Sequence, residues 1–252
     1  MSARSDRKKA LALAGATGDE KPGAAAKVLS QIIERSSRVQ APAIKAYVDR
    51  VRGGDRNASP AEIVKKLEKQ YMAAVMASGA AVGSAAALPG IGTLTAMSAV
   101  AGETVVFLEA TSLFVLAVAE VHGIPAHERE RRRALVLSVL VGEDSKRAVA
   151  DLLGAGRTSG AWITDGAATL PLPAVSQLNS RLLKYFVKRY TLKRGALAFG
   201  KVLPVGIGAV VGGLGNRMMG KRIIENARSA FGAPPSRWPA TLHVLPSAGP
   251  NP

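Results

Sequence analysis

The chain has no cysteine, only three histidines and few aromatic residues. Without cysteine it can form no disulfide, no thiol nucleophile and no zinc site with sulfur ligands. The histidines, His122, His127 and His243, include no pair four residues apart, which is the spacing at which a helix presents two imidazoles to one metal ion. No other catalytic set is evident, so we expect a protein that is not an enzyme, with no metal site and no cofactor.

Acidic residues are scarce in both outer regions of the chain. Residues 181–252 contain twelve Lys or Arg against one acidic residue, and residues 1–56 contain twelve against six, whereas the middle is nearly neutral. The formal net charge of +16 is therefore concentrated outside the middle. A basic excess of this kind favours anionic partners, either an anionic membrane surface or nucleic acid.

Strand-like alternation of apolar and polar residues is also missing, while alanine, leucine and glycine are abundant. We therefore predict an all-α protein, a helical bundle with Gly/Ala-rich hydrophobic helices. The predicted segments are a disordered, flexible basic arm (1–22), a helical N-terminal segment with a linker (23–57), a helical domain (58–232) and a disordered Pro-rich tail (233–252).

A long uncharged run lies inside the predicted helical domain. Ser59 and Pro60, followed by Glu62, indicate a helix start with Ser59 as the N-cap and Pro60 at the first position. No charged residue occurs from 72 to 102, and the Leu-Pro-Gly sequence at 88–90 predicts that this run forms two helices joined by a turn.

The second of these helices carries Glu103 and Glu109 within its apolar sequence. A bilayer span needs about 20 mainly apolar residues, and ionised side chains inside a span are costly. We therefore favour a bundle core or an interfacial hairpin over full spanning of a membrane.

Small residues recur every four positions in two apolar segments. On a helix this spacing lines one face and lets a second backbone approach closely, either in a membrane or inside a soluble bundle. Glycine costs about 1 kcal/mol in a helix interior relative to alanine, so these positions need a packing reason. The predicted helix-packing residues are Gly79, Gly83, Gly208, Gly212, Asn216 and Gly220.

A phosphate loop is the competing interpretation of the late glycine-rich segment. Gly215, Gly220 and Lys221 fit the G-x-x-x-x-G-K pattern, but Arg222 occupies the position of the magnesium-binding Ser or Thr. No strand precedes the motif, as a phosphate loop requires. We therefore favour a close-packing helix over a nucleotide site.

A basic amphipathic helix is predicted from about residue 173 to residue 194. Leu178, Leu182, Phe186 and Tyr190 form its apolar face, with Tyr185 near the boundary. Such a helix suits an anionic membrane surface or the phosphates of nucleic acid, or its polar side is merely solvated. The candidate anion-binding residues are Arg181, Lys184, Lys188, Arg189, Lys193 and Arg194.

Four sequence stretches resemble the EcsC family of bacterial proteins: "LPGIGT", "LAVAEVHGI", "ERRRALVLSVLVG" and "KVLPVGIGAVVGGLGNRMMGKRIIENARSAF". The resemblance covers about residues 58–232. It is most specific at Lys201, Pro204, Gly208, Gly212 and Asn216. It implies an α-helical protein for which membrane association is one expectation, and it supplies no catalytic residues.

Taken together, the charge distribution and the glycine spacing predict a non-enzymatic helical protein that docks through its cationic helix and its glycine-rich apolar helices. The expected partner is an anionic membrane surface, or a membrane or protein partner, and the expected location is cytoplasmic, peripheral to or partly inserted in the membrane. A soluble basic protein that binds nucleic acid is the alternative, and self-association into a homo-oligomer is also left open.

Overall fold

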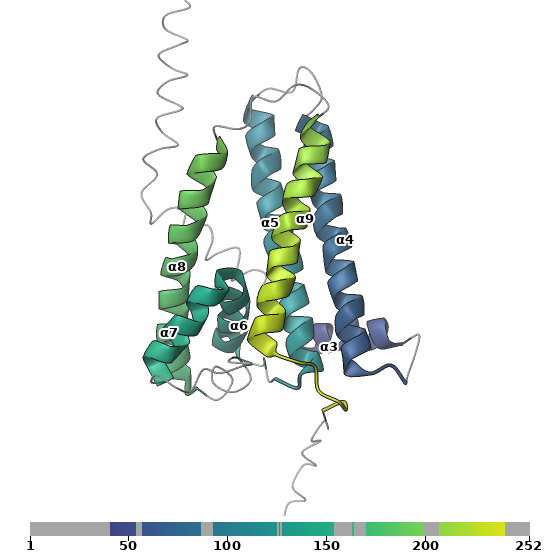
Figure 1. Cartoon of the computed structure of the whole chain (residues 1–252), viewed down its shortest axis with the longest axis vertical. Helices are drawn as coiled ribbons and strands as arrows, with labels where there is room; N and C mark the ends of the chain where they lie inside the picture. Colours follow the sequence, from purple (N-terminus) through teal and green to yellow (C-terminus); the bar gives the residue numbers. More distant parts are fainter. Residues whose placement is uncertain are drawn as a thin grey trace, which may run out of the picture.

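The computed structural model describes residues 41–53, 57–86, 93–124, 126, 128–153, 163, 170–198 and 207–239. These residues form seven helices and no strand, which confirms the predicted all-α class (Figure 1). The predicted basic arm at residues 1–22 lies outside them. The helices are α3 (Ala41–Arg52), α4 (Pro60–Ala86), α5 (Thr93–Val121), α6 (Arg129–Val141), α7 (Glu143–Leu153), α8 (Leu172–Ala198) and α9 (Ile207–Phe231).

Three long helices, α4, α5 and α9, lie side by side in one half of the bundle (Figure 1). α4 packs on both α5 and α9. α6 connects this group to α8, because it contacts α5 and α9 as well as α8. The short helices α3 and α7 pack on the long ones, α3 on α4 and α5, and α7 on α8.

The start of α4 has the hydrogen bonds of a capping box. The Ser59 amide donates to Glu62 Oε2 at 2.8 Å, and the Glu62 amide donates to Ser59 Oγ at 3.3 Å. The first bond satisfies the Ser59 amide, which has no partner within the helix, whereas the Glu62 amide also donates to Ser59 O at 3.0 Å. The hydrogen bonds from Ser59, first of all from its backbone, lower the pKa of Glu62. The predicted helix start is therefore confirmed.

The uncharged run forms two helices, α4 and α5, as the Leu-Pro-Gly sequence predicted. Residues 87–92, which join them, lie outside the described residues. α5 ends next to Gly123, whose φ of +70° is favourable only for glycine, and the Ile124 amide donates back to Ala119 O at 2.9 Å. Among the described residues, no helix combines the length and the hydrophobicity needed to cross a membrane.

The core lies where α4, α5, α6 and α9 meet. Its large buried side chains include Leu67 of α4, Leu116 of α5, Leu137 of α6 and Phe231 of α9. α6 illustrates why the sequence folds this way: its first turn is charged, and seven residues of its apolar second half are buried. The bundle thus excludes water from one continuous apolar cluster.

An aromatic pair fixes α4 to α5 inside this core. The rings of Tyr71 and Phe114 stack with their centroids 4.7 Å apart, and the Tyr71 hydroxyl hydrogen-bonds with Thr111 Oγ1 at 3.0 Å. Burial raises the pKa of Tyr71 above its usual value. The stacking packs Phe114 against Tyr71, and Phe114 also forms part of a pocket wall.

The segment after α9 includes the start of the predicted tail. The disordered tail was expected to begin at residue 233; residues 233–239 belong to the described structure, and Trp238 packs against the core. Trp238 Nε1 donates to Ala58 O at 2.9 Å, and the Arg52 guanidinium lies over the Trp238 ring, 4.3 Å from its centroid. Trp238 thus contributes apolar area and a hydrogen bond to a contact that the Pro-rich composition of the tail does not indicate.

Candidate functional site

α9 packs on α4 through small residues. A Cβ on Gly220 would lie 3.1 Å from Met72 Sδ and 3.6 Å from Val75 Cγ1, so the glycine permits this close approach. One turn earlier, the buried Asn216 donates from Nδ2 to Val75 O at 3.1 Å. Two of the predicted packing residues therefore face α4, and Gly79 of α4 is buried as well.

The other predicted packing glycines lie in the same two helices. Gly83 is in α4, and Gly208 and Gly212 are in α9, but the surroundings of all three are outside the described residues. The phosphate-loop motif, residues 215–222, is also part of α9. A continuous helix hydrogen-bonds its own backbone amides, so this segment cannot wrap a phosphate with them as a phosphate loop does.

An ion pair fastens the other end of the same helix pair. Arg228 of α9 donates from Nε to Glu68 Oε1 at 2.7 Å and from Nη2 to Glu68 Oε2 at 2.6 Å. The side chain of Glu68 is 11% exposed and that of Arg228 is 63% exposed. The hydrogen bonds to Glu68 raise the pKa of Arg228. Positions 216, 220 and 228 of α9 thus contact positions 75, 72 and 68 of α4, in decreasing order, so the two helices run antiparallel.

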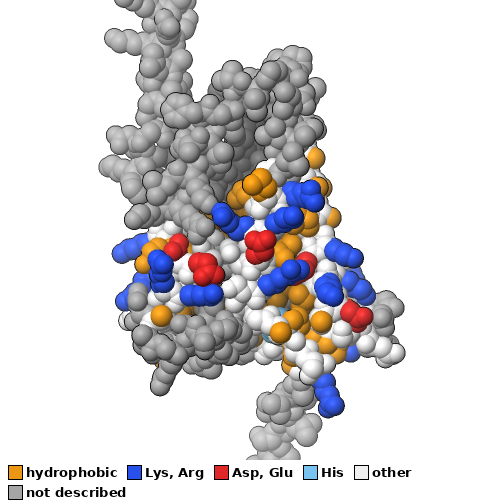
Figure 2. All heavy atoms as spheres, in the orientation of Figure 1, with side chains coloured by type: hydrophobic (Ala, Val, Ile, Leu, Met, Phe, Trp, Pro, Cys, Tyr) orange, Lys and Arg blue, Asp and Glu red, His pale blue; other side chains and the backbone are white. Residues whose placement is uncertain are grey.

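This antiparallel packing brings two cationic stripes together along one side of the seam. Lys65, Lys69, Met72 and Met76 share a side of α4 by helical spacing, as Arg217, Lys221 and Arg228 do on α9. Figure 2 shows Lys and Arg side chains over α9 and α4, with hydrophobic and some acidic side chains between them. We call this surface the α4–α9 edge; it consists of Lys65, Lys69, Met72, Met76, Arg217 and Lys221.

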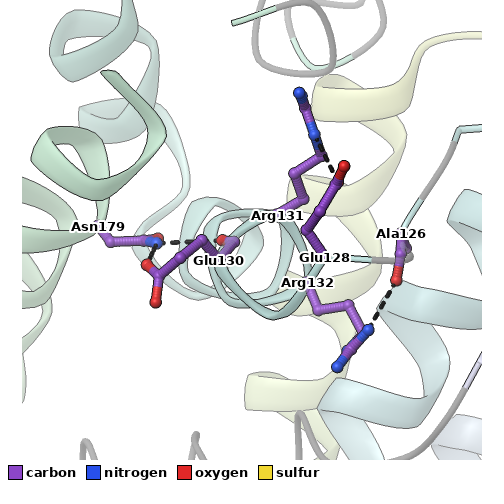
Figure 3. A network of polar contacts seen from close by, with 6 residues as sticks. All are labelled: Ala126, Glu128, Glu130, Arg131, Arg132 and Asn179. Carbon is purple, nitrogen blue, oxygen red and sulfur yellow. Dashed lines mark hydrogen bonds and ion pairs between the residues drawn. The ribbon is translucent and has the colours of Figure 1, made fainter. Parts of the chain in front are cut away.

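The cations of the α4–α9 edge differ from those at the start of α6. There, Arg131 pairs with Glu128 at 2.7 Å, and Arg132 Nη1 donates to Ala126 O at 3.0 Å (Figure 3). By contrast, within the described part of the chain Lys69, Arg217 and Lys221 have no ion-pair partner. The edge thus presents positive charge that an external anion can neutralise.

α8 has the amphipathic character that the sequence predicted over its described half. Leu178, Leu182 and Phe186 are buried, while Arg181 and Lys184 are exposed. Asn179 fixes the orientation of the helix, because its Nδ2 donates to Glu130 O at 3.0 Å and to Glu130 Oε2 at 2.6 Å (Figure 3). The side chains of the remaining predicted residues of α8 lie outside the described set: Lys188, Arg189, Tyr190, Lys193 and Arg194.

A pocket of about 510 Å³ lies at the Arg228 end of the α4–α9 edge. Buried apolar side chains from three helices line it: Val64 of α4, Phe114 and Val118 of α5, and Ala227 and Phe231 of α9. Residues 232–234 form a further wall. Its charged lining residues are Lys65, Glu68 and Arg228.

His122 also lines this pocket, and contacts with Val118 and Phe231 hold its ring in place. Its Nδ1 donates to Val118 O at 2.9 Å, and its ring lies 5.3 Å from the ring of Phe231. Burial lowers the pKa of His122 below its usual value, so the ring is neutral at neutral pH. No group of three or more His, Asp or Glu among the described residues could hold a metal ion.

Sequence reasoning missed both the pocket and the α4–α9 edge. The pocket residues come from segments 61–68, 114–122 and 227–234, and no spacing within one segment indicates that the three meet. The edge had a partial signal, since residues 217–222 read as a cationic stretch around two methionines. What could not be seen was the second row of cations that α4 places beside it.

Comparisons of the chain with protein-family models, with curated proteins and with solved structures find no match. The resemblance to the EcsC family, drawn from four sequence stretches, therefore stays a prediction.

Proposed function

We propose that the protein docks on anionic membrane surfaces as a peripheral, non-enzymatic helical protein on the cytoplasmic side. One observation carries this proposal: Lys69, Arg217 and Lys221 of the α4–α9 edge have no ion-pair partner among the described residues, and they lie beside exposed methionines. Met76 is 38% exposed, and Met218 and Met219 on the neighbouring surface of α9 are 74% and 48% exposed. Cations suit lipid phosphates, and flexible apolar side chains suit the boundary between head groups and acyl chains.

The magnitude of the electrostatic attraction is sufficient for reversible docking. Each Lys or Arg close to an anionic leaflet contributes about 1 kcal/mol. The four cations of the α4–α9 edge would then contribute about 4 kcal/mol, which corresponds to roughly a thousand-fold in affinity. This attraction is screened by salt, because the Debye length is about 10 Å at 0.1 M ionic strength.

Exposed methionine favours lipid over nucleic acid as the anionic partner. Proteins that bind single-stranded nucleic acid stack bases on aromatic side chains between cations. Among the edge residues no aromatic side chain occurs, and the apolar side chains there are Met72 and Met76. The resemblance to the EcsC family agrees with membrane association. The resemblance itself has no support from the comparisons.

Vesicle co-sedimentation tests the proposal. The double variant Lys69→Gln/Lys221→Gln should bind vesicles of phosphatidylcholine with 30% phosphatidylglycerol about 30-fold more weakly than the wild type, since two cations are lost. The matched control is Lys66→Gln/Arg222→Gln, which removes the same charge from exposed positions on other sides of α4 and α9. Equal losses in both variants would show that only net charge matters and that the edge is not the docking surface.

Two further arms complete the design. Arg181→Gln/Lys184→Gln tests whether α8 contacts the same membrane. If it does, the loss of vesicle affinity in this variant should add to the loss in the edge variant. If the wild-type protein does not bind anionic vesicles but binds duplex DNA with a steep salt dependence, the proposal is overturned in favour of nucleic-acid binding.

A further inference from the structure

We propose that the pocket at the Arg228 end of the α4–α9 edge binds one acyl chain of an anionic amphiphile, with the carboxylate or phosphate head group held at Lys65 and Arg228. This ligand site goes beyond membrane docking and does not require it, because a monomeric amphiphile in solution could occupy the pocket.

The inner wall of the pocket suits an alkyl chain. Its apolar side chains, Val64, Phe114, Val118, Ala227 and Phe231, come from three helices and are buried. Its volume of about 510 Å³ lies in the range of about 300–1,000 Å³ typical of small-molecule sites. His122 adds no charge to this wall, because it is neutral and its Nδ1 is used by Val118 O.

The charged residues that line the pocket favour an anion over a cation. The Glu68 carboxylate accepts two hydrogen bonds from Arg228 Nε and Nη2, which leaves Arg228 Nη1 outside this pair. Lys65 is exposed, and its ammonium adds a second positive charge. The three groups carry a net charge of +1, and a cationic head group would have to compete with Arg228 for Glu68.

The residues after α9 give the site a defined boundary. Gly232, Ala233 and Pro234 line one side of the pocket, and the chain beyond them is anchored where Trp238 Nε1 donates to Ala58 O. This wall connects the end of α9 to the start of α4. The opening beside Ala61, an exposed pocket-lining residue in the first turn of α4, is where a head group would remain in contact with water.

Calorimetric titration with saturated fatty acids below their critical micelle concentrations tests the inference. Each added methylene that enters the pocket should tighten Kd about fourfold, which is the equivalent of about 0.8 kcal/mol per methylene. The gain should stop at the chain length that fills the pocket. Dodecyl phosphate should bind like dodecanoate, whereas dodecyltrimethylammonium should bind at least tenfold more weakly.

Two pairs of variants locate the site. Ala61→Trp should obstruct the opening and weaken dodecanoate binding at least tenfold, while Ala73→Trp, at an exposed position on another side of α4, should leave it unchanged. Lys65→Gln should weaken dodecanoate binding more than dodecanol binding, and Lys66→Gln should affect neither. Thermal unfolding of each variant checks that the fold is intact.

The outcomes separate this inference from membrane docking. Absence of fatty-acid binding, equal binding of the cationic amphiphile, or an Ala61→Trp variant with full affinity would each overturn it. If Ala61→Trp loses amphiphile binding and also vesicle binding, the natural source is a bilayer lipid; if vesicle binding is retained, the source is a free amphiphile. Wild-type protein that binds dodecanoate but no vesicles would refute the proposed docking alone.

Discussion

Alanine substitution of two glycines in α9 tests how closely this helix packs on α4. In the interior of a helix, Gly→Ala stabilises by about 1 kcal/mol because alanine loses less backbone entropy. A Cβ on Gly215 would meet nothing within 4 Å. Gly215→Ala should therefore raise the free energy of unfolding by about 1 kcal/mol.

Gly220→Ala should lack this gain. Its Cβ would lie 3.1 Å from Met72 Sδ and 3.3 Å from Met72 Cε, well inside the optimum of about 3.5–4.0 Å between non-bonded carbon atoms. Overpacking costs typically about 1–3 kcal/mol, so the net effect should lie between neutral and about 2 kcal/mol of destabilisation. In a Met72→Ala background the clash disappears, and Gly220→Ala should then stabilise by about 1 kcal/mol.

Urea denaturation of the four single and double variants measures these differences as a double-mutant cycle. A coupling energy between positions 72 and 220 of about 1 kcal/mol or more is expected. Equal stabilisation by Gly215→Ala and Gly220→Ala in the wild-type background would refute the argument, because it would mean that α4 does not cover Gly220.

Two further predictions concern charged and titratable groups near the pocket. Arg228→Ala should lower the free energy of unfolding by about 1–3 kcal/mol, because it leaves the nearly buried Glu68 carboxylate unpaired. The loss should lie in the lower part of this range, since Arg228 is largely exposed. The control Arg222→Ala, at an exposed position, should change the urea midpoint little. Because burial lowers the pKa of His122, the unfolded state binds a proton more readily, so stability should fall as pH drops through the unfolded value of about 6.5 and level off below the folded pKa. The free energy of unfolding should therefore differ less between pH 7.5 and pH 5.5 in His122→Gln than in the wild type. A variant with the full wild-type pH dependence would show that His122 is not responsible.

Local signals predicted the helices well, because each acts within a few residues. Ser59 and Glu62 form the cap of α4 with bonds between residues three apart. The Leu-Pro-Gly sequence at 88–90 lies where α4 and α5 are separated. In α8, the apolar spacing of Leu178, Leu182 and Phe186 identified a face that is buried. Each of these features follows from helix geometry alone.

Partners across the bundle could not be predicted in this way. Glu68 and Arg228 are 160 positions apart, and Asn216 and Val75 are 141 apart. The contacts of Trp238 with Ala58 and Arg52 also join residues that are far apart in the sequence. Composition describes a segment in isolation and contains no information on the surface that it meets.

The amino-acid sequence by itself determined that this protein is helical, where α4 begins, where α4 and α5 separate, which face of α8 is apolar, and that the chain is strongly basic. Only the tertiary structure decided that α9 lies antiparallel on α4, that Lys65 and Lys69 join Arg217 and Lys221 on one edge, and that a pocket lies at its end. The physical reason is that periodicity along one helix specifies a surface to be covered, whereas the covering helix is selected by shape, such as Met72 against Gly220, and by charge, such as Glu68 with Arg228.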